Sequence, residues 1–159
     1  MMAPRFLLDG MLGSLARWLR IGGYDTEYRK DMKDNVLVDE ALRWSRILLT
    51  RDEVLAIRAK KRGVKSIYIK SERDEEALVQ LSAELGLTFD PTQSRCPKCN
   101  HAVEKVAKTD VEVRVPEGTF RVIDDYWACP KCGSVYWRGS HWPRIMETLK
   151  RAEVHPASI

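Results

Sequence analysis

The stretch Arg46-Ile-Leu-Leu-Thr-Arg-Asp52 decides the expected fold. It begins as a short aliphatic run and ends, over residues 50–52, with a hydroxyl, a cation and a carboxylate. A run of this length, followed by a helical pattern, predicts a strand that is buried on both faces of an α/β sheet. Ligand sites in such sheets lie just beyond the carboxyl ends of the strands. We therefore expect Asp52 to project into such a site.

A second apolar run, residues 5–8, repeats this design because Asp9-Gly10 follows it directly. Apolar runs then alternate with amphipathic stretches as far as residue 89. Further strands are expected at residues 24–28, 64–69 and 87–89, and helices at 11–21, 35–44, 53–62 and 72–85. This alternation predicts a mostly parallel sheet with flanking helices and right-handed crossovers. Asp90-Pro91 marks a break, which predicts an α/β domain over residues 1–91 and a second module over residues 92–159.

The second module contains all four cysteines, as the pairs Cys96-x-x-Cys99 and Cys129-x-x-Cys132. A two-residue spacer lets one tight turn aim two sulfurs at one ion, so two pairs predict a closed, structural zinc site. Iron in the same four-sulfur cage and a redox dithiol remain alternatives. His101 is a further possible ligand, in place of one cysteine. Around the cysteines we expect a hairpin arm at 111–115 with its turn at 116–118, a helix at 145–152 and a loose tail at 153–159.

Three acids carry the catalytic hypothesis, namely Asp9, Asp34 and Asp52. Carboxylates that converge at one sheet edge repel one another unless a cation lies among them. Their hard oxygen ligands suit Mg²⁺ or Mn²⁺, which support hydrolysis of phosphodiesters. Each acid also has a structural explanation: Asp9 as a turn residue, and Asp34 and Asp52 as helix N-caps. The side chains that compete with Asp34 for the third position are Asp31, Asp39 and Glu40.

The charge and hydropathy of the 159-residue chain exclude few classes of function. Its formal net charge is +4, which is compatible with an anionic partner without establishing one. No segment approaches the roughly 20 apolar residues of a membrane span, and the N-terminus does not read as a secretory signal. We expect a cytoplasmic protein with no membrane partner. Arg17 and Arg20 are expected on a solvated helix face, and Arg58, Lys61 and Arg62 on a second cationic stripe.

Several motifs together resemble the Mut-seven C-terminal RNase domain family. They are Phe6-Leu-Leu-Asp-Gly-Met-Leu-Gly-Ser-Leu-Ala-Arg-Trp-Leu-Arg-Ile-Gly-Gly-Tyr-Asp25, Leu48-Leu-Thr-Arg-Asp52, Ser94-Arg-Cys-Pro-Lys-Cys-Asn100 and Tyr136-Trp-Arg-Gly-Ser-His-Trp142. The resemblance covers nearly the whole chain. It implies a PIN-like nuclease domain with a C-terminal zinc ribbon, acting on RNA with a divalent metal. By position, Asp9 and Asp52 match the strand-end acids and Asp34 the acid that opens the second helix. A fourth acid has no clear match, and Asp74 and Asp90 are its candidates.

The resulting hypothesis is a metal-dependent ribonuclease in which Asp9, Asp34 and Asp52 hold Mg²⁺ or Mn²⁺. The expected phosphate contacts are Arg20, Arg51, Lys60, Lys61 and Arg62. The aromatic candidates for stacking on unpaired bases are Tyr126, Trp127, Tyr136, Trp137 and Trp142, with His141 as a further contact. The alternative for the aromatic residues is a small core around the zinc, which we favour for Trp127 and Tyr136. The rival functions are a non-catalytic nucleic-acid-binding module and a phosphatase with Asp9 as nucleophile.

Overall fold

Four short parallel strands form the central sheet of the computed structural model, which describes residues 2–153. They are β1 (Phe6–Leu8), β2 (Thr26–Tyr28), β3 (Ile47–Thr50) and β4 (Ser66–Tyr68), in the order β2-β1-β3-β4. The register places Leu8 opposite Leu49. Asp9 therefore emerges beside Thr50 at the carboxyl edge of the sheet. The predicted parallel α/β sheet is confirmed.

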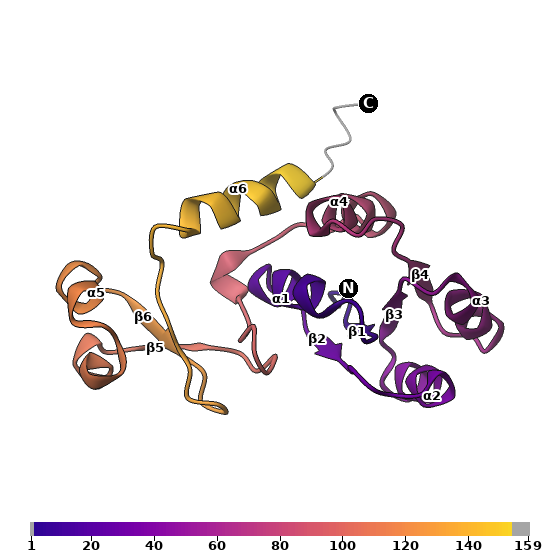
Figure 1. The fold of residues 1–159 in the computed structure, drawn as a ribbon, viewed down its shortest axis with the longest axis horizontal. Coiled ribbons are helices and arrows are strands. Elements are labelled where there is room, and N and C mark those ends of the chain that lie inside the picture. The colour runs from indigo at the N-terminus through magenta and orange to yellow at the C-terminus, as the bar shows by residue number, and fades with distance from the viewer. Residues whose placement is uncertain (1, 154–159) are drawn as a thin grey trace.

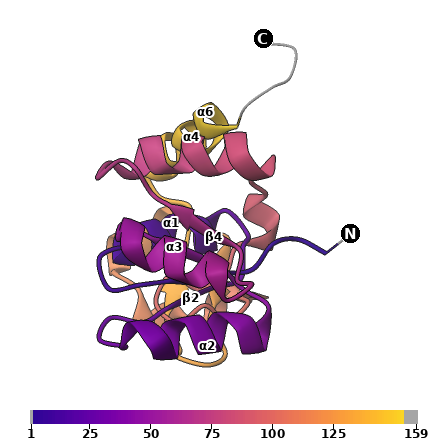
Figure 2. The same ribbon diagram turned by 90° about the vertical axis from the view of Figure 1, so that its right-hand side faces the viewer.

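Helices cover both faces of this sheet because successive strand residues point to opposite sides. Phe6 and Leu8 pack in one core with α1 (Gly13–Ile21) and α4 (Asp74–Leu85). Leu7 packs in a second core with α2 (Asp34–Trp44) and α3 (Glu53–Lys61). Figure 1 shows α4 and α2 on opposite sides of the strands, and Figure 2 shows the same layers after a quarter turn. None of the helices within residues 2–153 is long and apolar enough to cross a membrane.

The chain returns to the α/β unit at its end. Helix α6 (Trp142–Ala152) packs across α4, and its C-terminal end lies beside α4 in both views (Figures 1 and 2). Its residues Leu149 and Ala152 are buried in the same core as α1 and α4. The helix expected at 145–152 thus begins earlier, at Trp142. It packs on the α/β unit, which was expected to end at residue 91. Of the tail expected at 153–159, residues 154–159 lie outside the described part of the chain.

The zinc module is a three-stranded antiparallel sheet of β5 (Glu104–Val106), β6 (Tyr126–Ala128) and β7 (Val135–Tyr136). The hairpin expected at 111–115 is wrong. That region forms the 3-10 turns η2 (Lys108–Asp110) and η3 (Glu112–Arg114), and helix α5 (Glu117–Val122) follows. Val111 and Val115 are buried while Val113 is 95% exposed. The alternating valines thus do not form one buried strand face; two of them, four residues apart, fill a small core with Tyr126 instead.

The strand expected at 87–89 is also absent from the described residues. Leu87 packs in the core beneath α1 and α4, and the Phe89 amide N–H donates to Glu153 Oε1 at 2.8 Å. The segment therefore runs beside α6 instead of extending the sheet beyond β4. It leads into the 3-10 turn η1 (Pro91–Gln93), which begins the passage to the zinc module.

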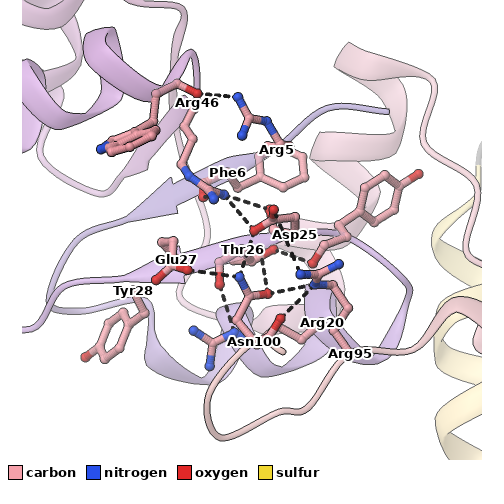
Figure 3. A network of polar contacts seen from close by, with 12 residues as sticks. Arg5, Phe6, Arg20, Asp25, Thr26, Glu27, Tyr28, Arg46, Arg95 and Asn100 are labelled. Atoms are coloured by element: carbon pink, nitrogen blue, oxygen red, sulfur yellow. Dashed lines mark hydrogen bonds and ion pairs between the residues drawn. The ribbon is translucent and has the colours of Figure 1, made fainter. Parts of the chain in front are cut away.

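A polar network attaches the first cysteine turn to strand β2 (Figure 3). Asn100, which has a left-handed φ of 71°, accepts the Thr26 amide N–H at 2.9 Å. Arg20 Nε donates to the Thr26 carbonyl oxygen at 2.9 Å, and its Nη1 donates to Pro97 O at 2.8 Å. Both backbone groups of Thr26 on this sheet edge are thereby satisfied, which protects an edge that would otherwise offer free pairing groups. Arg20 is 7% exposed, so the prediction that it lies on a solvated face is wrong.

Candidate active site

The hydroxyl of Thr50 connects Asp9 and Asp52 at the carboxyl edge of the sheet. Thr50 Oγ1 donates to Asp9 Oδ2 at 2.6 Å and accepts the Asp52 amide N–H at 3.0 Å. The side chain of Asp52 in turn accepts the Leu55 amide N–H at 3.1 Å, so it caps α3. This is the structural explanation that the sequence offered for Asp52. Two acids that are far apart in the sequence are therefore joined through one side chain.

Asp9 lies in an environment that disfavours a lone negative charge. Its Oδ1 is buried and has no hydrogen-bond partner among the described residues. Burial is the main cause that raises the pKa of Asp9, and the charges of Asp52 and Asp34 raise it further, against the lowering effect of the Thr50 hydrogen bond. A buried carboxylate oxygen without a partner costs free energy. A cation at this oxygen would remove that cost, so the site fits a divalent metal.

Asp34 approaches this edge from the first position of α2. The helix cap is Lys33, without a side-chain hydrogen bond, so Asp34 is one residue inside the position expected for an N-cap. Asp34 Oδ2 lies 4.0 Å from Arg58 Nη1 of α3. Its charge reaches Asp9. About half of the Asp34 side chain is accessible. This position suits a ligand that completes a site formed by the other two acids.

The competing acids near Asp34 have other partners or positions. Asp39 pairs with Arg62 at 2.7 Å, and Glu40 pairs with Arg29 at 2.6 Å. Asp31 is exposed in the loop after β2. Of the two candidates for a fourth acid, Asp74 begins α4, which follows β4 and the same sheet edge. Asp90 instead caps η1, where its amide N–H donates to Gly22 O beyond the far end of α1.

The expected phosphate contacts divide between the two ends of the molecule. Arg51 stays at the acidic edge, paired with Glu72 at 2.7 Å. Lys61 is the last residue of the nine-residue helix α3, which starts at the Asp52 cap, so it lies about 13 Å along the helix from the acids. Arg20 is buried and held by backbone carbonyl oxygens. The structure thus brings Arg51 to the acids, but neither Lys61 nor Arg20.

The four cysteines converge as predicted. The ligand sulfurs of Cys96, Cys99, Cys129 and Cys132 all lie within 4.8 Å of one another. Cys96 Sγ lies 3.7 Å from Cys132 Sγ, close to the separation of thiolates around one tetrahedral zinc ion. Nothing in the described part of the chain gathers acids as tightly, which is consistent with carboxylates that repel one another without a cation. The cysteine cluster therefore fits a structural zinc site.

The aromatic residues of the module have different environments. Tyr126 is fully buried and forms the small core, while the Tyr136 hydroxyl lies 3.0 Å from Cys96 Sγ. Trp127, expected in that core, instead lines a surface pocket with Trp137 and Trp142. His141 is exposed at the start of α6 and makes no capping hydrogen bond with its side chain.

Sequence reasoning missed two residues that the structure places beside the acids. Thr50 was seen only as the end of a strand, and Arg58 only as part of a cationic stripe. The signal for Thr50 was available, because a hydroxyl that ends a buried strand between two strand-end acids is in hydrogen-bonding reach of both. Arg58 carried no such signal, because its proximity to Asp34 depends on how α2 packs beside α3.

The fold and the two sites define an α/β domain with a zinc ribbon. The chain matches the Mut7-C RNAse domain family over residues 4–149. It therefore belongs to the Mut7-C RNAse domain family, and this membership indicates a nuclease-type function. Comparison with curated proteins and with solved structures gave no match in either case.

Proposed function

We propose that this protein is a ribonuclease that hydrolyses RNA phosphodiester bonds with Mg²⁺ or Mn²⁺. The observation that carries the proposal is the geometry at Asp9. Its Oδ2 is fixed by Thr50, which also holds Asp52, while its Oδ1 is buried without a partner. Asp9, Asp34 and Asp52 form the ligand set, with Asp74 as the candidate for a fourth acid.

Each residue has a defined task in this mechanism. Asp9, Asp34 and Asp52 would hold the Mg²⁺ or Mn²⁺ ion, which would supply an activated water and neutralise charge on the phosphate oxygens. Thr50 keeps the Asp9 carboxylate in one orientation, and the helix cap made by Asp52 does the same for the second ligand. Arg51 and Arg58 come from segments that flank this edge, and each would bind the phosphate, because a guanidinium group can donate two parallel hydrogen bonds to it. Lys61 and His141 serve only as outlying contacts, and Arg20 positions the zinc module.

The test is a cleavage assay on labelled single-stranded RNA with the zinc-loaded chain. Cleavage is expected with Mg²⁺ or Mn²⁺ and not with added Zn²⁺ alone. Asp9→Asn and Asp52→Asn should each lower the rate about a hundredfold or more, because a catalytic metal supplies several kcal/mol of stabilisation. Asp39→Asn is the matched control, since that acid pairs with Arg62 on the surface. EDTA would also remove zinc from the cysteine site. Each metal condition therefore starts from dialysed protein whose zinc content has been measured.

The rival functions give different results in the same experiment. A nucleic-acid-binding module binds RNA in every metal arm but never cleaves it. A phosphatase releases phosphate from a monoester and leaves the RNA chain intact. An Asp52→Asn variant that cleaves RNA at the wild-type rate would show that the proposed ligand set is wrong.

A further inference from the structure

A pocket of about 350 Å³ lies where the zinc module meets the end of α1 and the start of α6. Its walls include Ile21 of α1, Trp127 of β6, Trp137 and Trp142. No acidic side chain lines it within residues 2–153, whereas Arg95, Lys105 and Arg138 do. The pocket is therefore aromatic and positively charged.

Arg138 is held between two indole rings at this pocket. Its guanidinium carbon lies 4.9 Å from the centre of the Trp127 ring and 5.0 Å from that of Trp142. Lys105 is 6.0 Å from the Trp127 ring and pairs with Asp125. Arg138 has no ion pair with any described residue, so its charge is balanced only by the faces of the two rings. The arrangement leaves a cation and flat apolar surfaces available to a ligand.

Trp127 and Trp142 are not among the residues that fill the core of the zinc module, whereas Trp137 packs against it. That core consists of Val111, Val115 and the fully buried Tyr126. Trp127 and Trp142 remain half-buried beside it. A ligand with a flat π face and a negative charge matches this lining best, because bases stack on aromatic and guanidinium planes. An unpaired nucleotide has both features, whereas the faces of paired bases are covered by their neighbours.

The pocket is remote from the acids. Ile21 ends α1, while the Leu12 amide N–H before that helix donates to Asp9 O at 3.1 Å. The nine residues of α1 span about 13 Å. A stacked strand that rises about 3.4 Å per nucleotide covers this length in about four nucleotides. A strand held in the pocket would therefore reach the acids only with several nucleotides between.

We propose that this pocket binds one unpaired nucleotide of the RNA, several nucleotides away from the bond that is cut. This proposal rests on the proposed function, since it takes RNA as the ligand. The strand is then held at two points, by the acids with their metal and by the stack of Trp127, Arg138 and Trp142. A stacked RNA strand shorter than about five nucleotides does not reach both points.

Binding is measured in the Asp52→Asn background, so the result does not depend on cleavage. The probes are fluorescently labelled oligo(A) of three and twelve nucleotides, the twelve-nucleotide strand in a duplex, and free AMP. Arg138→Ala is expected to weaken binding of the single-stranded twelve-mer on the order of tenfold. Arg43→Ala is the matched control, because Arg43 also lies over a tryptophan, Trp44, at 5.5 Å on α2. The control is expected to change affinity less than twofold.

Four outcomes overturn the proposal: equal loss of affinity in the control, no loss in Arg138→Ala, equal sensitivity of the duplex, or AMP binding as tightly as the twelve-mer. The last result would assign the pocket to a free nucleotide. Photo-cross-linking of 5-iodouridine RNA to the chain with Arg138 intact gives a second measurement if Arg138→Ala misfolds. Cross-links at Trp127 or Trp142 support the proposal, and cross-links only elsewhere contradict it. A wild-type chain that shows this binding pattern but does not cleave RNA in any metal arm would instead count against the proposed function alone.

Discussion

At the scale of single residues, the small side chain of Thr50 links two acids of the candidate site. Its hydroxyl donates to one acid and accepts from the backbone of the other, across 41 positions of sequence. The residue is fully buried, so no water replaces a lost hydrogen bond. The Asp9 carboxylate and the Asp52 backbone are therefore linked through one oxygen atom, in addition to the pairing of β1 with β3.

Thr50→Val removes this hydroxyl at nearly constant volume. We expect unfolding free energy to fall by about 1–3 kcal/mol, because Asp9 Oδ2 and the Asp52 amide both lose a buried partner. We also expect weaker Mn²⁺ binding and slower cleavage. Urea unfolding and calorimetric titration with Mn²⁺ measure the two effects. Thr50→Ser keeps the hydroxyl and should retain most of the metal affinity; equal metal affinity in Thr50→Val would contradict the role given to this residue.

Asp25 is a second residue whose charge state is set by its neighbours. Burial by itself raises its pKa, but hydrogen bonds from Arg46 and Asn100, with the charges of Arg46 and Arg95, outweigh burial and lower the pKa below its ordinary value. Arg46 Nη1 lies 2.8 Å from Asp25 Oδ1, and Figure 3 shows the contact. A lowered pKa stabilises the folded state at a pH above the pKa of the unfolded chain. This contribution is lost as the pH falls through the folded-state pKa.

Asp25→Asn should therefore lower stability by about 1.5–3 kcal/mol at pH 7, the usual contribution of a hydrogen bond to a charged group. The difference between variant and wild type should shrink below about pH 4, where the free acid protonates. Urea unfolding from pH 3 to pH 7 measures it. Asp39→Asn, on an exposed pair, should cost less than about 1 kcal/mol. A difference that is constant with pH would exclude this linkage.

At the scale of elements, α6 belongs energetically to the α/β unit although it follows the zinc module in sequence. Leu149 is 1% exposed and packs in the core with α1 and α4. Phe89 and Glu153 join the same helix to the segment after α4. The zinc module is thus inserted between α4 and α6. Both of these helices pack in the same core of the α/β unit.

Leu149→Ala should destabilise the α/β unit by about 2–5 kcal/mol, since it leaves a cavity in a packed core. Leu42→Ala on α2 is the control, because Leu42 is 49% exposed; its cost should stay near 0.5 kcal/mol. Chemical denaturation followed by far-UV circular dichroism measures both. Equal stability of Leu149→Ala and wild type would show that α6 is not part of this core.

At the scale of the whole molecule, the zinc module protects an edge of the nuclease sheet. Asn100 and Arg20 satisfy the outward backbone groups of Thr26 on β2. Asn100 follows the ligand Cys99 directly, so the position of its side chain depends on the metal turn. A zinc ion held by the four cysteines would therefore stabilise both the module and the covered edge of the sheet.

Removal of zinc by Cys129→Ser with Cys132→Ser should unfold the ribbon, because structural zinc supplies on the order of 10 kcal/mol. Hydrogen exchange at the Thr26 amide should become much faster, while exchange at the Leu48 amide, which donates to Lys65 O, stays slow. Zinc content and exchange by mass spectrometry or NMR measure this. His101→Ala should keep its zinc, since four sulfurs complete the site. Unchanged protection of Thr26 in the cysteine variant would contradict the coupling.

The sequence by itself determined the features that depend on local patterns. The spacing of the cysteines predicted the zinc cluster, and the short aliphatic run before Asp52 predicted a buried strand with an acid at its end. Each Cys-x-x-Cys pair and the run before Asp52 span only a few residues. These patterns can therefore be recognised without knowing how the rest of the chain packs. The alternating valines at 111–115 misled, because period-2 alternation requires a partner strand that only the folded module could supply or withhold.

Only the tertiary structure decided which distant residues meet. Arg20 is buried because the first cysteine turn packs on β2, and α6 joins the α/β core because the chain returns across α4. The stack of Arg138 between two tryptophans likewise joins different elements. No local pattern encodes such contacts, since each forms only when the free energy of the whole packed chain favours it.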